Sequence, residues 1–317
     1  MYVNKILKSV LVALLFMISS VSAFAGDLLK PYVLAYTTGG DVAKVTDEVK
    51  AKLTGAGFEI AGSYSPFADA NIIVVTNDAL KKAAGSSEFG GYLAPMRVTI
   101  TKQFGNGKGV AFDPKDAQIQ VAFTNPVYWA AAYRVAEDVS DVKAKLAAAL
   151  GSKEEYGSFY GFKDGISADD LKKYHYTVMM EYFDNPSDLG DHDSYAEAVK
   201  AVETGLEAHA GGTSKVYRID IPGKEETVFG VALTSGCSGD EATIKAVDMG
   251  PIHSTGYAPY EILVSGKNVY ALYARFRIAI AYMGLPMMSN PTGGTFMNIM
   301  CAPGAIEEAL LAAAGEE

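Results

Sequence analysis

The second half of the chain repeats, in the same order, the elements that the residue pattern predicts for the first half. The first half predicts a strand at 31–37, a helix at 42–53, strands at 58–64 and 71–76, a short helix at 78–84 and a hairpin at 93–123. The second half predicts a strand at 174–182, a helix at 194–208, strands at 215–221 and 227–234, a short helix at 240–247 and a hairpin at 258–273. Apolar periodicity and turn residues carry these assignments. Two diverged copies of one α+β unit explain the shared order.

Short matching strings open the two predicted hairpins. Residues 91–95 read GYLAP and residues 256–259 read GYAP, so we expect Pro95 to fall on Pro259 and the two tyrosines to match. The expected fold class is α+β, with two similar sandwich-like domains forming a pseudo-dimer. Each domain has the order strand, helix, strand, strand, helix, hairpin, helix.

The predicted domain boundaries follow this repeat. The first α+β domain covers 26–150 and ends in an alanine-rich helical region. A connector rich in Gly and Tyr covers 151–172, and the second α+β domain covers 173–317. Because 49% of the 317 residues are hydrophobic, the chain can bury a sizeable core.

Residues 1–25 have the features of a secretory signal peptide. Lys5 and Lys8 precede an apolar run at 10–18, and Ala-Phe-Ala at 23–25 has the small-residue pattern of a cleavage site. No later stretch reaches 18 uninterrupted apolar residues, so we expect no integral membrane segment after signal removal. The sequence therefore predicts a soluble protein that is periplasmic or secreted.

Charge and cysteine content exclude several partners and chemistries. Without the signal peptide, 25 basic and 37 acidic residues give a net charge of −12, which disfavours nucleic acid and anionic membranes as partners. Cys237 and Cys301 are the only cysteines, and the absence of a CxxC string argues against thioredoxin-like chemistry. In an oxidising compartment we expect the two thiols to be either bonded to each other or both buried.

Several short strings resemble the bacterial domain of unknown function 302 family. They are GFEI at 57–60, IIVVTN at 72–77, APMRV at 94–98 and TNPVY at 124–128, with YAPY at 257–260 and VYALY at 269–273 as a second copy. The resemblance implies two tandem diverged copies, each a compact α+β sandwich. It implies no reaction and no catalytic residues.

The hairpin region of the second half supplies the candidate ligand-binding residues, Tyr257, Arg275, Arg277 and His253. A continuing strand would place both arginines on one face beside a tyrosine, as an anion or carboxylate site. A helix beginning near Ala274 would separate them, and the strand-ending Asn-Pro at the matching place in the first half favours this helix. None of the four histidines lies in a recognisable catalytic motif, and a structural role for His253 is the simpler interpretation.

Two other segments offer metal ligands. Met297, Met300 and Cys301 lie in a methionine-rich segment whose soft sulfur atoms would suit Cu(I), although methionine also fills cores. The acidic residues at 184–193 supply oxygen atoms that calcium prefers, but their spacing is not that of an EF-hand. The favoured interpretation is that Asn185-Pro186 makes a turn and that Asp191 and Asp193 stabilise the positive end of the following helix. A capping box of Ser194 and Glu197 is predicted to open that helix.

These observations predict an exported accessory module that binds a small ligand or an exported protein partner. No cofactor is expected, and an enzyme is disfavoured because no catalytic constellation is recognisable. The alternative is a soft-metal or thiol-dependent redox accessory protein that uses the methionines together with Cys237 and Cys301. A seam between two tandem domains is a common place for a pocket.

Overall fold

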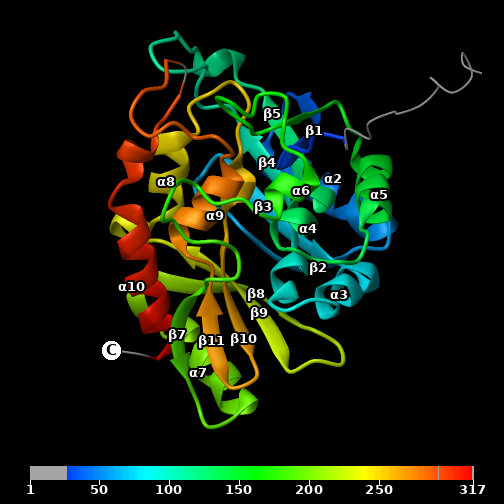
Figure 1. The fold of residues 1–317 in the computed structure, drawn as a ribbon. Helices are drawn as coiled ribbons and strands as arrows, with labels where there is room; N and C mark the ends of the chain where they lie inside the picture. Colours follow the sequence, from blue (N-terminus) through cyan, green and yellow to red (C-terminus); the bar gives the residue numbers. More distant parts are fainter. Residues whose placement is uncertain (1–26, 292, 316–317) are drawn as a thin grey trace, which may run out of the picture.

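The computed structural model describes residues 27–291 and 293–315, so the predicted signal peptide lies outside the described residues. Within them, the protein is α+β, with a six-stranded and a five-stranded antiparallel sheet and nine α-helices. Figure 1 shows the first sheet, blue to green, above the second sheet, green to orange. The predicted α+β class is confirmed.

The first sheet has the strand order β2-β3-β4-β5-β1-β6. Its strands are β1 (Tyr32–Thr38), β2 (Glu59–Tyr64), β3 (Ala70–Thr76), β4 (Met96–Lys102), β5 (Ile119–Thr124) and β6 (Glu154–Tyr156). The second sheet has the order β7-β11-β10-β9-β8. Its strands are β7 (Ser187–Asp191), β8 (Thr213–Asp220), β9 (Glu226–Leu233), β10 (Tyr260–Ser265) and β11 (Asn268–Ala271).

Helices cover these sheets and fill the boundary between them. They are α2 (Val42–Gly55), α3 (Asp78–Gly85), α4 (Pro126–Ala132), α5 (Ser140–Leu150), α6 (Ala168–Leu171), α7 (Tyr195–Glu207), α8 (Asp240–Val247), α9 (Ala274–Ala281) and α10 (Ala302–Ala314). Helices α2 and α5 pack on the first sheet, and α7 and α10 pack on the second. The buried stripe of α2 (Val45, Val49 and Leu53) has the helical spacing that the sequence shows.

The two sheets share one order of connection, apart from the extra edge strand β6. Strands β2-β3-β4-β5-β1 of the first half stand in the same sequence as β8-β9-β10-β11-β7 of the second. The β-bulges also match: they lie between Ile60 and Gly62 in β2, Lys215 and Tyr217 in β8, Leu34 and Tyr36 in β1, and Asp188 and Gly190 in β7. A bulge bends a strand at a defined place, so matching bulges give both sheets the same local bend.

One predicted strand is wrong. Residues 174–182 form turns and irregular chain, and the strand at this place in the order is β7, Ser187–Asp191. Aromatic side chains of this segment contact other parts of the protein: Tyr174 packs on Phe162 and Tyr176 stacks on Phe296. Strand β7 lies at the sheet edge and buries few apolar side chains, so its sequence lacks a strong alternating pattern.

The two halves contact each other through corresponding turns. The 3₁₀ turn Gly90–Leu93 packs on β9 and β10 of the second sheet, and the turn Thr255–Tyr257 packs on β3 and β4 of the first. The Gly91 amide donates a hydrogen bond of 2.8 Å to Oε1 of Glu226. A Cβ atom at Gly91 would lie 2.6 Å from the end of the Leu263 side chain, so a larger residue would displace that side chain from the contact.

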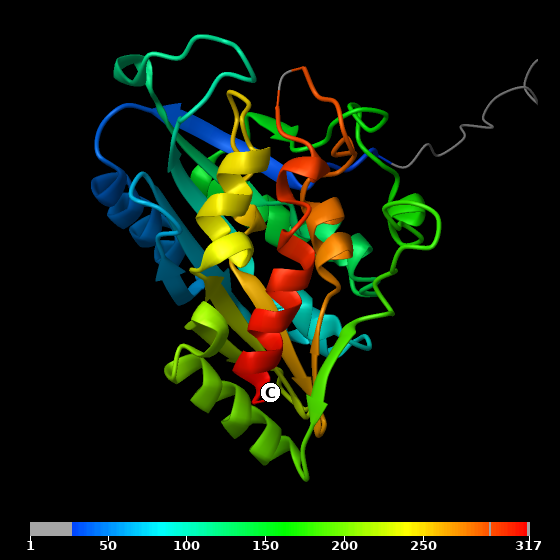
Figure 2. The same ribbon diagram turned by 90° about the vertical axis from the view of Figure 1, so that its left-hand side faces the viewer.

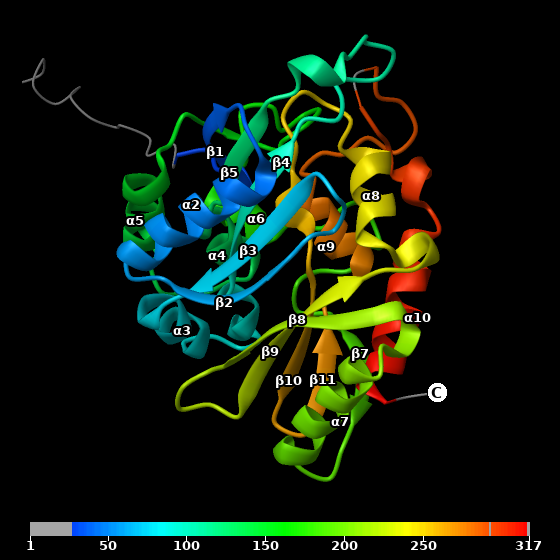
Figure 3. The same ribbon diagram turned by 180° about the vertical axis from the view of Figure 1, so that it is seen from behind.

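Strands β2 and β8 also lie against each other at the boundary (Figure 3). At Gly62 a Cβ atom would lie 2.3 Å from the carbonyl oxygen of Val216, so a larger residue cannot occupy this position without moving the strand. Gly62 and the neighbouring Tyr217 occupy matching places beside the bulges of the two strands. The two halves therefore meet at corresponding positions of their edge strands.

A buried charged cluster joins the halves inside the core. Arg97 of β4 and Arg277 of α9 both pair with Glu261 of β10, and the three residues are at most 1% exposed. Nε of Arg277 donates to Oε2 of Glu261 at 3.1 Å, and Nη2 donates to the carbonyl of Tyr257 at 2.7 Å. The Trp129 ring lies 5.0 Å from the Arg277 guanidinium. The cluster combines one carboxylate with two cations.

Of the two alternatives predicted for the thiols, the structure has the disulfide: Cys237 is bonded to Cys301, with a Cα–Cα distance of 5.8 Å. It joins the turn Gly236–Ser238 to the residue before α10, and such bonds are typical of oxidising compartments. Closing a loop of this length stabilises the folded state by about 4 kcal/mol in the chain-entropy treatment.

Helix α10 lies beside α7, as Figure 2 shows. Gly205 of α7 permits this contact, because a Cβ atom there would lie 2.2 Å from the carbonyl oxygen of Ala313. By length and composition alone, the helical stretch Phe296–Ala314 is apolar enough to cross a membrane. A core helix of a globular protein meets the same criterion, and α10 buries Ile306, Leu310 and Ala313.

Candidate functional site

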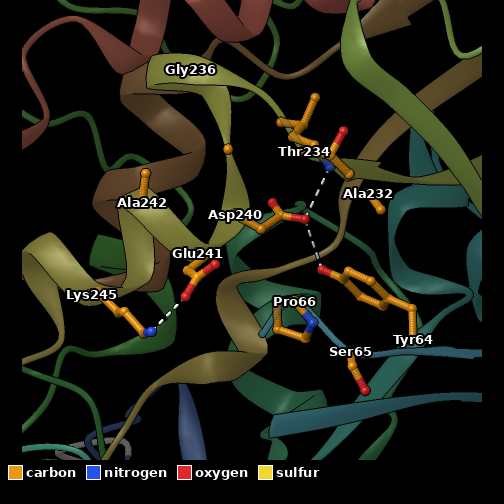
Figure 4. A pocket seen from close by; sticks show the side chains of 12 residues that line it. Tyr64, Ser65, Pro66, Ala232, Thr234, Gly236, Asp240, Glu241, Ala242 and Lys245 are labelled. Carbon is orange, nitrogen blue, oxygen red and sulfur yellow. Dashed lines mark hydrogen bonds and ion pairs between the residues drawn. The ribbon is translucent and has the colours of Figure 1, made fainter. Parts of the chain in front are cut away.

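A cavity of about 470 Å³ lies where β2 meets β9 and α8 (Figure 4). Residues 64–66, at the end of β2 and just beyond it, form one wall. Residues of the second half between 232 and 245 form the others, including the end of β9 and the first turns of α8. The cavity volume falls in the range of pockets that hold small molecules.

The buried carboxyl of Asp240 is the main polar group of this cavity. The Tyr64 hydroxyl donates a hydrogen bond of 2.9 Å to Oδ2, and the Leu233 amide donates one of 3.0 Å to the same oxygen. Asp240 is 2% exposed, and no hydrogen bond among the described residues reaches Oδ1. Figure 4 shows this second oxygen turned away from Tyr64. Tyr64 and Leu233 thus orient the carboxyl and leave one oxygen open to a ligand.

Burial perturbs the proton affinity of this site. Loss of solvation raises the pKa of Asp240 from 3.8 to about 7, and the hydrogen bonds from Leu233 and Tyr64 and the charge of Arg277 offset only part of that rise. Burial, together with the nearby Asp240 charge, also raises the pKa of the Tyr64 hydroxyl, which therefore stays protonated as a donor. Near neutral pH the carboxyl can exist in either protonation state.

The only lysine that lines the cavity is engaged elsewhere. Lys245 forms an i,i+4 ion pair with Glu241 on α8. Its ammonium group also lies 4.9 Å from the centre of the Phe67 ring. Since Lys245 and Glu241 pair with each other, no cationic side chain among the residues that line the cavity pairs with Asp240.

The disulfide holds one edge of the cavity. Gly236 lines the cavity and has a φ of 55°, a conformation that favours glycine. The adjacent Cys237 is bonded to Cys301, and the Ser238 hydroxyl donates 2.7 Å to the carbonyl of Ser235. The loop between β9 and α8 is therefore fixed against the start of α10.

The arginines and Tyr257 predicted as ligand-binding residues do not line this cavity. The helix expected from Ala274 is confirmed as α9, which separates the two arginines. Arg277 and Tyr257 are buried in the junction, where Arg277 pairs with Glu261. Arg275 is partly exposed and pairs with Glu181. Their assignment to a ligand stays a prediction, and the structure gives both arginines protein partners.

His253 is buried, and its contacts are those of a histidine with a structural role. The Phe104 amide donates 3.1 Å to Nε2, which leaves the proton on Nδ1 to be donated to the Asp248 carbonyl, also at 3.1 Å. The ring stacks on Phe104 with 3.7 Å between the ring centres. Burial lowers the pKa of His253 to about 4. Both ring nitrogens are engaged, so the ring has no nitrogen left for a ligand.

These contacts predict a pH-dependent contribution of His253 to stability. Between pH 6.5 and 4 the unfolded chain binds a proton at this residue and the folded protein does not, so stability is lost as the pH falls through this window. The depressed pKa corresponds to about 3 kcal/mol. In urea unfolding, we expect His253→Gln to be less stable than the wild-type protein at pH 7. At pH 4 this difference in the free energy of unfolding should be about 3 kcal/mol smaller. A penalty that is equal at both values would contradict the neutral, buried state.

The sulfur-rich segment divides between the surface and the disulfide. Met297 and Met300 are exposed, and the sulfur of Cys301 is committed to the bond with Cys237. In the described part of the chain, no three His, Cys, Asp or Glu side chains gather where they could hold a metal ion. The soft-metal alternative stays a prediction, and for Cys301 it requires the reduced protein.

The acidic residues at 184–193, considered above as calcium ligands, take part in a strand and in ion pairs. Part of this segment is β7, Asp191 pairs with Lys267, and Asp184 pairs with Arg134. The predicted capping of α7 is confirmed, because Ser194 accepts a hydrogen bond from the Glu197 amide.

Sequence reasoning missed Tyr64 and Asp240. They lie 176 positions apart, and their hydrogen bond depends on the packing of β2 against the second half. An acidic residue at the first position of a helix has an ordinary explanation in the helix dipole. The sequence therefore carries no separate signal that this carboxyl is buried.

Comparison with known proteins found no match to the chain among family models, curated proteins or solved structures. The resemblance drawn from short strings accordingly stays a prediction.

Proposed function

We propose that the protein is an exported binding protein of two similar α+β domains packed as a pseudo-dimer, with a small ligand held in the cavity around Asp240. The observation that carries this proposal is a largely buried carboxyl, placed in a cavity whose walls come from both halves, with one oxygen that no described protein donor reaches. Because Tyr64 and Leu233 both bind Oδ2, Oδ1 is left as an oriented acceptor for a donor that enters the cavity.

The equivalence of the halves supports the pseudo-dimer. Placing Pro95 on Pro259 also places Thr99 on Leu263. Their ladder partners, Ala122 and Tyr270, then correspond to each other as well. On this alignment Arg97 corresponds to Glu261 and Trp129 to Arg277. Each pair is in contact across the junction, as expected when two copies meet about a two-fold axis. The resemblance to the domain of unknown function 302 family is part of this proposal and rests on the short strings alone.

The disulfide and the predicted signal peptide support an exported location, in the periplasm or outside the cell. In that setting the cavity would be occupied by a molecule taken from the surrounding medium or handed over by an exported partner. The proposal assigns no reaction to the site.

Native mass spectrometry of the full exported chain tests the proposal. We expect protein purified without denaturation to carry a small molecule that is released by acid or solvent. Ala242 is exposed on the cavity wall, and Ala242→Trp should fill the space and abolish the bound mass. Ala79→Trp, at an exposed position in the first turn of α3, is the matched control and should retain it. Equal occupancy in both variants, or no bound molecule in the wild-type protein and no binding on screening, would overturn the proposal.

A further inference from the structure

We propose that the cavity selects an organic cation with an N–H donor, such as a primary ammonium or guanidinium group, and that Oδ1 of Asp240 accepts its hydrogen bond. This inference deepens the proposed function and rests on it. It names the ligand class from the charge, the hydrogen bonding and the lining of the same cavity.

The hydrogen bonding leaves an acceptor without a donor. Both protein donors, the Tyr64 hydroxyl and the Leu233 amide, engage Oδ2. A ligand N–H group would complete the carboxylate at Oδ1, and a charge-assisted hydrogen bond of this kind is stronger than a neutral one. An anionic ligand would instead face the carboxylate directly and be repelled.

The surrounding charges favour a positive ligand. Glu241 and Lys245 form a pair at the rim, so the ionisable side chains other than tyrosine that line the cavity sum to −1 when Asp240 is ionised. A buried anion that lacks a cationic partner is costly, and a cation in the cavity would remove that cost. The charge of Arg277 also lowers the pKa of Asp240, but by less than either hydrogen bond, and Arg277 is paired with Glu261.

The rest of the lining suits the apolar part of such a molecule. Tyr64, Pro66, Ala232 and Ala242 are among the residues that line the cavity (Figure 4). A flat or short aliphatic group can therefore lie against these side chains while the ammonium group points to Asp240.

The hydrogen-bonded pair of Tyr64 and Asp240 has no counterpart at the corresponding place in the repeat. The shared fold therefore does not need this pair, which supports a functional role for it. Helix α3 begins at Asp78 as α8 begins at Asp240, but Asp78 is exposed. By the strand ladders, the residue that corresponds to Tyr64 is Ile219, which has no hydroxyl. Only one of the two corresponding places carries a buried tyrosine–aspartate pair.

Isothermal titration of the full chain at pH 8 tests the ligand class with three probes of similar size: phenethylammonium, 2-phenylethanol and 3-phenylpropionate. We expect phenethylammonium to bind at least about 10-fold more tightly than either other probe. Asp240→Asn keeps an oxygen for Tyr64 and Leu233 but turns an amide donor toward the ligand. It should weaken phenethylammonium binding by about 10-fold or more.

Asp78→Asn is the matched control, because it makes the same change at the corresponding exposed position, and it should bind phenethylammonium as the wild-type protein does. Preference for the alcohol or the carboxylate, with sensitivity to Ala242→Trp, would overturn the cation inference and leave the binding function standing. Binding of phenethylammonium that Asp240→Asn does not change would also overturn the inference. If no probe binds and native mass spectrometry finds no ligand, the proposed function itself fails.

Discussion

Replacing Glu261 with glutamine is expected to destabilise the folded protein by about 5 kcal/mol, because the change leaves two buried guanidinium groups without a counter-charge. Arg97 and Arg277 are fully buried and cannot rotate into water without opening the junction. A loss of this size is comparable with the whole stability of many domains. Chemical unfolding at pH 7, followed by circular dichroism, measures it.

The matched control is Glu241→Gln, which breaks the exposed ion pair with Lys245 and should cost less than about 1 kcal/mol. If Glu261→Gln does not fold, the triple variant Arg97→Met, Glu261→Leu, Arg277→Met provides a second test. It replaces all three charges with apolar side chains and should fold again, because no buried charge is left unpaired. A penalty for Glu261→Gln as small as that of the control would contradict the role of the cluster.

Asp240 is expected to make the wild-type protein less stable as the pH rises from 4 to 8. The folded-state pKa, about 7, lies above the usual 3.8, so the folded protein holds a proton that the unfolded chain has lost. Stability from this group is fully present below pH 3.8 and is lost as the pH rises through 7. The shift corresponds to about 4 kcal/mol.

Comparison with Asp240→Asn isolates this contribution from those of other buried groups such as Asp248 and His253. At pH 4, urea unfolding should give similar free energies of unfolding for the wild-type protein and Asp240→Asn. At pH 8 the variant should gain about 4 kcal/mol on the wild-type protein. Asp78→Asn should show no such trend. A difference between wild type and Asp240→Asn that stays constant with pH would show that this carboxyl is not desolvated.

The elements of the fold follow from local patterns to a large extent. Apolar spacing predicted α2, the short helix α8 was predicted with its observed bounds, and the strands of both hairpins were located. These segments are long or strongly periodic, and turn residues such as Gly266 separate them. Strand β7 was missed because an edge strand with one deeply buried apolar residue, Leu189, has no pattern to detect.

The candidate site depends on tertiary packing that local patterns do not encode. The helix that separates Arg277 from Arg275 was predicted, but their acidic partners, Glu261 and Glu181, lie 16 and 94 positions away and were not. Asp240 resembles any acidic residue at a helix start until Tyr64 and Leu233 are brought against it. The burial of one side chain is set by both halves together, so sequence reasoning on either half alone does not reach it.

The most direct test of the binding site is a carboxyl-carbon NMR titration of Asp240, assigned by comparison with Asp240→Asn, with and without saturating phenethylammonium. We expect a midpoint near pH 7 in the free protein, because the carboxyl is buried and only one of its oxygens has protein donors. With the probe bound, the midpoint should be at least about one unit lower, since a bound cation favours the charged form. A midpoint near pH 4 that the probe does not move would contradict a buried, cation-binding Asp240.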